Sequence, residues 1–222
     1  MTPIVKICGL STPATLDAAL DAGADMVGFV FFPKSPRHID WGQARALAQQ
    51  ARGRAKIVAL TVDADDDTLK RIAEALAPDL LQLHGRETPA RVRQIGEFAA
   101  RPTMKAIGVA AREDFAAAAP YEGVADFLLI DAKAPEGAAL PGGNGRPFDW
   151  GLTRDIRFRR PWLLSGGLDP ETVEAAIAAS GASGVDVSSG VENAPGVKDP
   201  AKIRAFVVAA RGAFARAAEG VA

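Results

Sequence analysis

Residues 4–23, IVKICGLSTPATLDAALDAG, contain one complete unit of the pattern that predicts the fold. A β-branched run over residues 4–8 ends at Cys8 and is followed by a glycine. An alanine-rich amphipathic segment begins at Thr12 and Pro13, a helix-capping residue before a residue favoured at the first helical position. The stretch therefore predicts a strand followed by a helix.

The same unit recurs along the chain. Short runs rich in Val, Ile and Leu occupy residues 4–8, 26–31, 56–62, 79–84, 104–109, 126–131, 162–167 and 184–189. Amphipathic segments separate most of them, and Asp169-Pro170 repeats the cap before a proline. Strands that alternate with helices pair in parallel through right-handed crossovers. The pattern predicts an α/β fold, a (β/α)8 barrel with eight parallel strands that forms a single domain over residues 1–222. A doubly wound open sheet is the alternative, although it usually has fewer strands.

Composition excludes several classes of protein. The 222 residues are 48% hydrophobic and 24% charged, with a net charge of −1 and no basic stripe that would indicate a nucleic-acid partner. We expect no membrane span, because no apolar stretch approaches the roughly 18 residues that one needs. We expect a cytoplasmic protein, since a single cysteine forms no internal disulfide. Two histidines and one cysteine, far apart in the sequence, also predict no metal site.

Polar residues stand where the predicted strands end, which is where barrels of this type place their active sites. Cys8 ends the first run, His84 the fourth and Asp131 the sixth, while Asp186 lies near the end of the eighth. Alternation along each strand puts each of them on one face of its strand. If these faces point toward the barrel axis, one mouth gathers a thiol, an imidazole and two carboxylates.

Two further polar features have a structural explanation. Lys6 and Gln82 lie on the same faces as Cys8 and His84, and can equally form a polar layer inside the barrel whose members satisfy one another. We expect the acidic run at residues 63–67 to cap and complement the next helix rather than bind a metal.

Two glycine-containing loops predict a phosphate site. LSGGLDPETV follows the seventh run and DVSSGVE ends the eighth, and the loops after these strands commonly hold phosphate in barrels. Glycine lets backbone N–H groups approach an anion closely, and helix N-termini favour negative charge. The predicted phosphate-binding residues are Gly166, Gly167, Ser188, Ser189 and Gly190. We expect Asp169 to cap its own helix, because it would repel the anion if it pointed inward.

A third glycine-rich stretch, LPGGNGRPFDW at residues 140–150, follows the sixth run. It is either a solvent-exposed connector or a lid that closes over the site beside Asp131. Two of its glycines, Gly143 and Gly145, are candidate substrate-binding residues.

Several motifs together resemble one known family. KICGL, GFVFFPKSPRHI, LQLHGRE, GGNGRPFDW, LSGGLDPETV and GVDVSSGVENAPGVKDPAKI are similar, in this order, to the motifs of the phosphoribosylanthranilate isomerases of tryptophan biosynthesis. They extend over residues 6–206. The chain departs at Asn144, where the family more often has Thr, and in LTVD of the third strand, where an aromatic residue is common.

The resemblance implies an Amadori rearrangement of N-(5-phosphoribosyl)anthranilate, without metal or organic cofactor. It implies that Cys8 is the general base and Asp131 the general acid. It further implies that Arg37 holds the anthranilate carboxylate and that His84 and Asp186 line the substrate pocket. The implied partner is this small phosphorylated substrate, and we expect a monomer or homodimer.

The residue types suit this chemistry. An acid is needed to open the sugar ring, and a base is then needed to remove the C2 proton of the resulting Schiff base. A free thiol has a pKa of about 8.5, so a thiol base requires neighbours that lower its pKa. Lys6 and the N–H groups of Gly9 and Leu10 are the candidates in the sequence.

Two other functions remain open at this point. One is another phosphosugar barrel, such as the ribonucleotide isomerase of histidine biosynthesis, whose family has Asp where Cys8 stands. The other is a catalytically silent barrel that binds a phosphorylated ligand or serves as a scaffold. Cys8 argues against the first, and the combination of Cys8, Asp131 and Arg37 with the glycine loops argues against the second.

Overall fold

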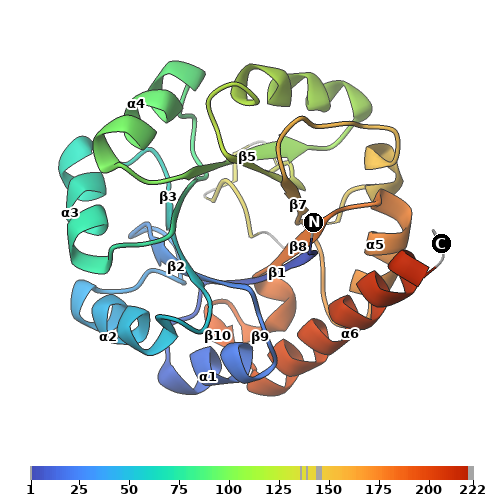
Figure 1. Cartoon of the computed structure of the whole chain (residues 1–222), viewed down its shortest axis with the longest axis horizontal. Helices are drawn as coiled ribbons and strands as arrows, with labels where there is room; N and C mark the ends of the chain where they lie inside the picture. Colours follow the sequence, from blue (N-terminus) through green and yellow to red (C-terminus); the bar gives the residue numbers. More distant parts are fainter. Residues whose placement is uncertain (1, 136, 139, 144–146, 220–222) are drawn as a thin grey trace.

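Eight parallel strands close into a barrel in the computed structural model, which describes residues 2–135, 137–138, 140–143 and 147–219. The strands are β1 (Ile4–Cys8), β2 (Met26–Phe31), β3 (Lys56–Thr61), β4 (Leu80–Leu83), β5 (Thr103–Val109), β6 (Phe127–Ala132), β7 (Trp162–Leu164) and β8 (Gly184–Val187). Each strand pairs with the next, and β8 returns to β1. Figure 1 looks along the barrel and shows the helices arranged around the ring of strands. The predicted barrel is confirmed.

The elements between the strands follow the predicted alternation in part. Five of the connections, and the segment after β8, contain the α-helices α1 (Pro13–Asp21), α2 (Trp41–Ala51), α3 (Asp66–Leu76), α4 (Pro89–Ala99), α5 (Val173–Ser180) and α6 (Pro200–Glu219). The segments after β5 and β6 instead contain the 3-10 helices η1 (Arg112–Tyr121) and η2 (Trp150–Thr153). The segment after β8 also contains η3 (Ser189–Val191) and a hairpin of β9 (Glu192–Ala194) and β10 (Val197–Lys198).

Two of the predicted helix starts are confirmed. The hydroxyl of Thr12 accepts a hydrogen bond from the N–H of Thr15 at the start of α1, and Pro13 is the first helical residue. Asp65 likewise accepts the N–H of Thr68 at 2.8 Å, so residues of the acidic run cap α3 as predicted.

The predicted start of α5 at Pro170 is wrong, because this helix begins at Val173. The side chain of Asp169 accepts the N–H groups of Glu171 and Thr172, at 3.0 and 2.7 Å, and closes a turn ahead of the helix. Asp169 thus engages its own chain, as expected, but the helix starts three residues later than predicted.

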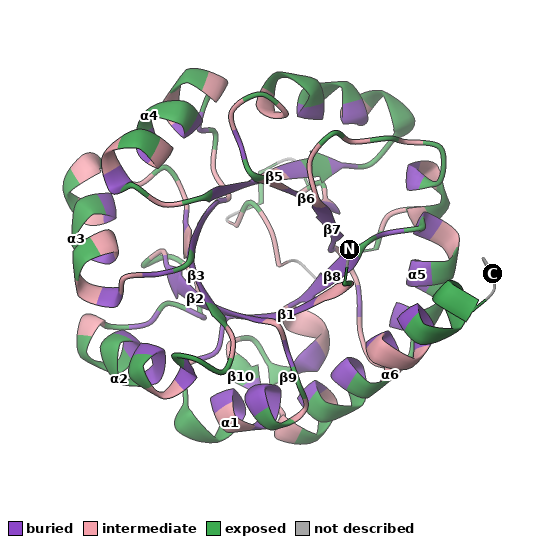
Figure 2. Cartoon of the chain, viewed as in Figure 1, coloured by how far each residue is buried: buried purple, intermediate pink, exposed green. Residues whose placement is uncertain are grey.

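The interior of the barrel is apolar at one end and polar at the other. Its apolar layer consists of Met26, Val58, Leu80, Met104, Leu129 and Leu163. Lys6, Gln82 and Asp186, which point toward the axis nearer the carboxyl ends of their strands, are buried. Figure 2 shows the buried ring of strands, and helices that are buried on their inner faces and exposed outside. The alternation therefore directs the predicted polar residues to the mouth at the carboxyl ends of the strands.

Candidate active site

A pocket opens at this mouth, and about 810 Å³ of space lies within the pocket and its open entrance. Its lining includes Cys8, Arg37, Gln82, His84, Asp131, Gly142, Gly143, Ser165, Gly166, Gly167, Asp186, Ser188 and Ser189. Of the predicted site residues, Gly190 does not line it, and Gly145 lies outside the described residues. The structure thus gathers side chains that lie up to 181 positions apart in the sequence.

Cys8 is the last residue of β1 and is a buried free thiol. Gly28 on the neighbouring strand makes room for it, since a Cβ at Gly28 would lie 2.9 Å from Cys8 Sγ. The glycine that follows Cys8 serves another side chain: Gly9 has a φ of +77°, and a Cβ there would lie 2.9 Å from Cδ of Arg37. Gly28 is a site residue that sequence reasoning missed, because only strand pairing reveals the contact.

The electrostatic environment of Cys8 differs from the predicted one. Burial raises the pKa of the thiol above its ordinary value, and this outweighs the lowering by the charge of Lys6. Asp186 also raises the pKa, whereas Lys198 lowers it. The N–H groups of Gly9 and Leu10 both donate to the carbonyl of Gly28, at 2.9 and 3.1 Å. Of the predicted neighbours, Lys6 does lower the thiol pKa but does not overcome burial, and the N–H groups of Gly9 and Leu10 serve the Gly28 carbonyl instead.

An ion pair lies directly beneath Cys8. Lys6 Nζ donates to Asp186 Oδ1 at 2.6 Å, and both side chains are almost completely buried. Burial opposes the charge on Lys6, but the charges and hydrogen bonds of Asp186 and Cys8 together outweigh it and raise the pKa of Lys6. Lys6 is thus satisfied by Asp186, which also lines the pocket, whereas Gln82 Oε1 in the same polar layer is buried without a hydrogen-bond partner among the described residues.

A second polar group surrounds Asp131 at the end of β6. Asp131 Oδ1 accepts the N–H of Ala132 at 2.9 Å, and His84 Nε2 lies 3.2 Å from Asp131 Oδ2. The other ring nitrogen of His84, Nδ1, is 3.1 Å from Gln82 Nε2. With the amide nitrogen as donor to Nδ1, the proton of a neutral imidazole lies on Nε2 and points toward Asp131. His84 and Asp131 are brought together as predicted.

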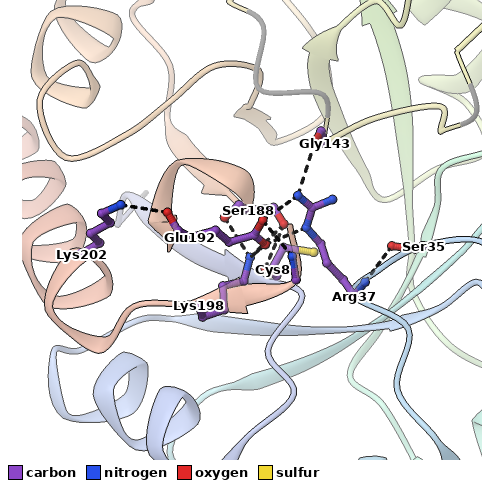
Figure 3. Close-up of polar contacts among 9 residues, drawn as sticks. Cys8, Ser35, Arg37, Gly143, Ser188, Glu192, Lys198 and Lys202 are labelled. Carbon is purple, nitrogen blue, oxygen red and sulfur yellow. Dashed lines mark hydrogen bonds and ion pairs between the residues drawn. The ribbon is translucent and has the colours of Figure 1, made fainter. Parts of the chain in front are cut away.

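Arg37 enters the pocket from the loop after β2, but its guanidinium is already paired. Its Nε and Nη2 donate to the two carboxylate oxygens of Glu192, at 2.7 and 2.9 Å. Lys198 Nζ donates to the same carboxylate at 2.6 Å and to the carbonyl of Ser188 at 2.8 Å. Figure 3 shows Glu192 between the two cations. Burial disfavours the charge of Glu192, but Arg37 and Lys198 outweigh it and lower its pKa below 4.5.

Sequence reasoning missed Glu192 and Lys198. The signal was present, because Pro195-Gly196 between two short runs is a turn signature. The resulting antiparallel hairpin pairs Lys198 with Glu192, which is why two residues six positions apart meet. Burial lowers the pKa of Lys198 although the charge of Glu192 opposes this.

The two predicted phosphate loops lie side by side. Gly166 and Gly167 have φ values of +86° and +68°, which favour glycine, and both line the pocket with Ser188 and Ser189. Gly190 instead packs against the other loop, and a Cβ there would overlap the carbonyl of Leu168. The close approach of the two loops therefore explains why residue 190 is a glycine.

Residues 140–143 contact the two ends of the site. A Cβ at Gly142 would lie 2.7 Å from Asp131 Oδ2, and one at Gly143 would lie 2.7 Å from Arg37 Nη1. Gly143 has a φ of +70°, and its carbonyl accepts a long hydrogen bond of 3.4 Å from Arg37 Nη2. These contacts favour the lid over the exposed connector. Asn144, like Gly145, is outside the described residues.

Within residues 2–135, 137–138, 140–143 and 147–219, no three His, Cys, Asp or Glu side chains are grouped so that they could hold a metal ion. Over the same residues, no helix combines the length and the apolar character that crossing a membrane requires.

Residues 5–209 match the family described as N-(5'phosphoribosyl)anthranilate (PRA) isomerase. The chain belongs to this family. The N-(5'-phosphoribosyl)anthranilate isomerase of Rhodopseudomonas palustris is 60% identical over 207 residues, which are 93% of this chain and 95% of that one. The family resemblance of the sequence motifs is thereby confirmed.

Solved structures of the isomerase family have the same fold. The phosphoribosylanthranilate isomerase of Thermotoga maritima has a TM-score of 0.85 and 38% identity, covering 96% of this chain and all of that one. A second structure, with a TM-score of 0.81 and 34% identity over 96% of this chain and all of that one, is a complex with reduced 1-(o-carboxyphenylamino)-1-deoxyribulose 5-phosphate. The latter isomerase thus binds a phosphorylated compound that carries an aromatic carboxylate.

Proposed function

We propose that this chain converts N-(5-phosphoribosyl)anthranilate to 1-(2-carboxyphenylamino)-1-deoxyribulose 5-phosphate, a step of L-tryptophan biosynthesis, with Cys8 as general base and Asp131 as general acid. Membership of the isomerase family supports the reaction. One observation carries the assignment of residues: a thiol on β1 and a carboxylate on β6, separated around the barrel by β7 and β8, line a single pocket.

Ring opening requires a proton at the ring oxygen of the sugar, and Asp131 supplies it. The carboxyl group is held by the N–H of Ala132 on one oxygen and faces His84 Nε2 on the other. These contacts fix its direction, and a positioned acid of this kind typically accelerates a reaction by about 10² to 10⁴-fold.

Cys8 then removes the proton from C2. Ring opening leaves a Schiff-base cation, and a positive charge near the thiol favours the thiolate. Lys6 and Lys198 already act in this direction, against the larger effect of burial. The base therefore becomes active when the substrate charge arrives beside it. Loss of the C2 proton gives an enolamine, which tautomerises to the ketone, so only protons move and no metal or organic cofactor is needed.

The two ends of the substrate are assigned to different parts of the pocket. Arg37 binds the anthranilate carboxylate, because a guanidinium pairs a carboxylate bidentately. The loops with Gly166, Gly167, Ser188 and Ser189 bind the phosphate through backbone N–H groups. Gly190 supports the loop and does not itself contact the phosphate. His84 and Asp186 line the space between the two ends, and Gly143 and Gly145 belong to the lid.

Three further assignments belong to this proposal. Residues 1–222 act as one catalytic domain, which the closed barrel of strands between residues 4 and 187 supports. The reaction takes place in the cytoplasm, where the single free thiol stays reduced. The active species is a monomer or a homodimer; one relative of Thermotoga maritima is described as a dimer that was also made monomeric.

The direct test is the fluorescence of phosphoribosylanthranilate after purified protein is added. We expect the fluorescence to fall as product forms, with saturation at high substrate. A protein that binds the reduced product analogue but leaves the fluorescence unchanged would be a silent barrel, and the proposed reaction would be wrong.

A further inference from the structure

Glu192 is the most heavily bonded carboxylate of the site. Its Oε1 accepts hydrogen bonds from Arg37 Nε and Lys198 Nζ, at 2.7 and 2.6 Å. Its Oε2 accepts from Arg37 Nη2 at 2.9 Å and from the backbone N–H of Gly196 at 3.2 Å. The side chain is 4% exposed. A carboxylate accepts about four hydrogen bonds, so Glu192 has no acceptor capacity left for a substrate or a proton in transit.

We propose that Glu192 is a positioning residue that holds Arg37 by one edge of its guanidinium and thereby aims the other edge at the carboxylate of the substrate. The inference rests on the proposed role of Arg37. It assigns to Glu192 a function in substrate binding that involves no contact with the substrate.

The shape of the guanidinium supports this arrangement. Arg presents five N–H donors in a rigid plane, and one bidentate pair uses only two of them. Glu192 takes the edge formed by Nε and Nη2, which leaves the edge formed by Nη1 and the second N–H of Nη2. Gly143 of the lid lies at that second edge, where its carbonyl accepts only a long hydrogen bond of 3.4 Å from Nη2, a contact that a substrate carboxylate would replace. Figure 3 shows Glu192 and Gly143 on different sides of the Arg37 side chain.

The charges explain why Lys198 is present. A carboxylate beside Arg37 would otherwise cancel its positive charge and weaken its attraction for a second carboxylate. Lys198, whose side chain is 1% exposed, supplies the second cation, so that Arg37, Glu192 and Lys198 together carry one net positive charge. The set can therefore hold Arg37 in place and still attract an anion.

Backbone contacts fix the set to the rest of the site. Lys202 Nζ donates to the carbonyl of Glu192 at 2.8 Å, and Lys198 Nζ donates to the carbonyl of Ser188 at 2.8 Å. The hydroxyl of Ser188 in turn donates to the carbonyl of Cys8 at 3.2 Å. The guanidinium is thus positioned relative to both the phosphate loop and the base.

The test compares two ligands that differ only in the carboxylate. We would measure by calorimetry the binding of reduced 1-(2-carboxyphenylamino)-1-deoxyribulose 5-phosphate and of its counterpart without the carboxyl group. Glu192→Gln places an amide among donors and loosens Arg37. We expect it to weaken binding of the carboxylate ligand by about tenfold or more, because a hydrogen bond to a charged group typically contributes that much. Binding of the ligand without the carboxyl group should stay within about twofold of the parent. KM should rise by a similar factor while kcat changes little.

Two controls separate positioning from general destabilisation. Glu87→Gln makes the same change in an equally buried ion pair, since Glu87 pairs with Lys105 at 2.9 Å and lines no part of the pocket. We expect it to lower stability and to leave both ligands unchanged. In the Arg37→Ala background, Glu192→Gln should change binding of the carboxylate ligand by no more than about twofold, because residues that act through one contact are not additive.

The outcomes are distinguishable. If Arg37→Ala binds the carboxylate ligand as tightly as the parent, the proposed role of Arg37 is wrong and this inference falls with it. A second outcome is that Arg37→Ala weakens binding of the carboxylate ligand, whereas Glu192→Gln leaves it unchanged or weakens binding of both ligands equally. In that case Arg37 binds the carboxylate but Glu192 does not position it. If Glu192→Gln does not fold, Glu192→Asp replaces it, because it keeps the charge but is one methylene shorter. It too should weaken binding of the carboxylate ligand and not of the other ligand.

Discussion

Leu129 and Asp131 lie two residues apart on β6, on the same face of the strand, and yet they belong to different halves of the barrel interior. Leu129 is fully buried in the apolar layer, against Met104, Leu163 and their neighbours. Asp131 lines the pocket and is held by Ala132 and His84. One strand thus both stabilises the barrel and carries the chemistry, and the change occurs within one repeat of the pleat.

The largest effect is expected at the polar end. Asp131→Asn keeps the shape of the side chain but removes the acid. We expect kcat to fall by about 10² to 10⁴-fold, while the melting temperature stays within a few degrees of the parent. Steady-state assays and thermal unfolding of the same preparation measure both. A decrease in kcat of less than about tenfold would exclude Asp131 as the general acid.

The matched substitution at the apolar end should behave in the opposite way. Leu129→Ala leaves a cavity in the interior layer, and such changes typically cost about 2 to 5 kcal/mol of unfolding free energy. We expect kcat to remain within about threefold of the parent at a temperature where the variant is folded. Denaturant titration gives the free energy. A loss of activity without a loss of stability would show that the two halves are not separate.

Gly28→Ala tests the boundary between the halves from the side of Cys8. The added Cβ would lie 2.9 Å from Cys8 Sγ and 3.2 Å from Cys8 Cα, so the thiol has to move. A displacement of this kind in a positioned base should lower kcat by about ten to a hundredfold. Gly123→Ala serves as the control, because a Cβ there meets nothing within 4 Å and the backbone φ at this position is not positive. Equal activities of the two variants would contradict the assigned packing.

The smallest effect concerns the titration of Cys8. Its pKa is raised above 9.0, so the reactive thiolate is the minor form at neutral pH and increases as the pH rises. We expect the rate of alkylation of the unliganded protein by iodoacetamide to rise about tenfold per pH unit between pH 7 and 9, without a plateau. A plateau below pH 9 would mean that Lys6 and Lys198 outweigh burial.

The fold and the positions of the strand-end residues were predictable from local patterns. Each run of β-branched residues marks its own strand, and alternation decides which residues face the axis, so Cys8, His84, Asp131 and Asp186 were placed correctly. The start of α5 was not predictable, because Asp169 followed by Pro170 has the signature of a helix cap. Here Asp169 instead closes a turn ahead of the helix.

What local patterns could not supply were contacts between distant segments. The space that Gly28 leaves for Cys8 depends on strand pairing, and the pairing of Arg37 with Glu192 joins residues 155 positions apart. The raised pKa of Cys8 is of the same kind, since it follows from burial in the closed barrel, which a sequence does not display.

The central claim is that the thiol of Cys8 is the base of this site, and Cys8→Ser tests it most directly. A hydroxyl is nearly the same size but is a far weaker acid, so the variant keeps the pocket and loses the base. With phosphoribosylanthranilate fluorescence as the assay, we predict that kcat falls by at least about a hundredfold while the reduced product analogue binds as tightly as to the parent. A variant that retains turnover within tenfold of the parent would contradict the account.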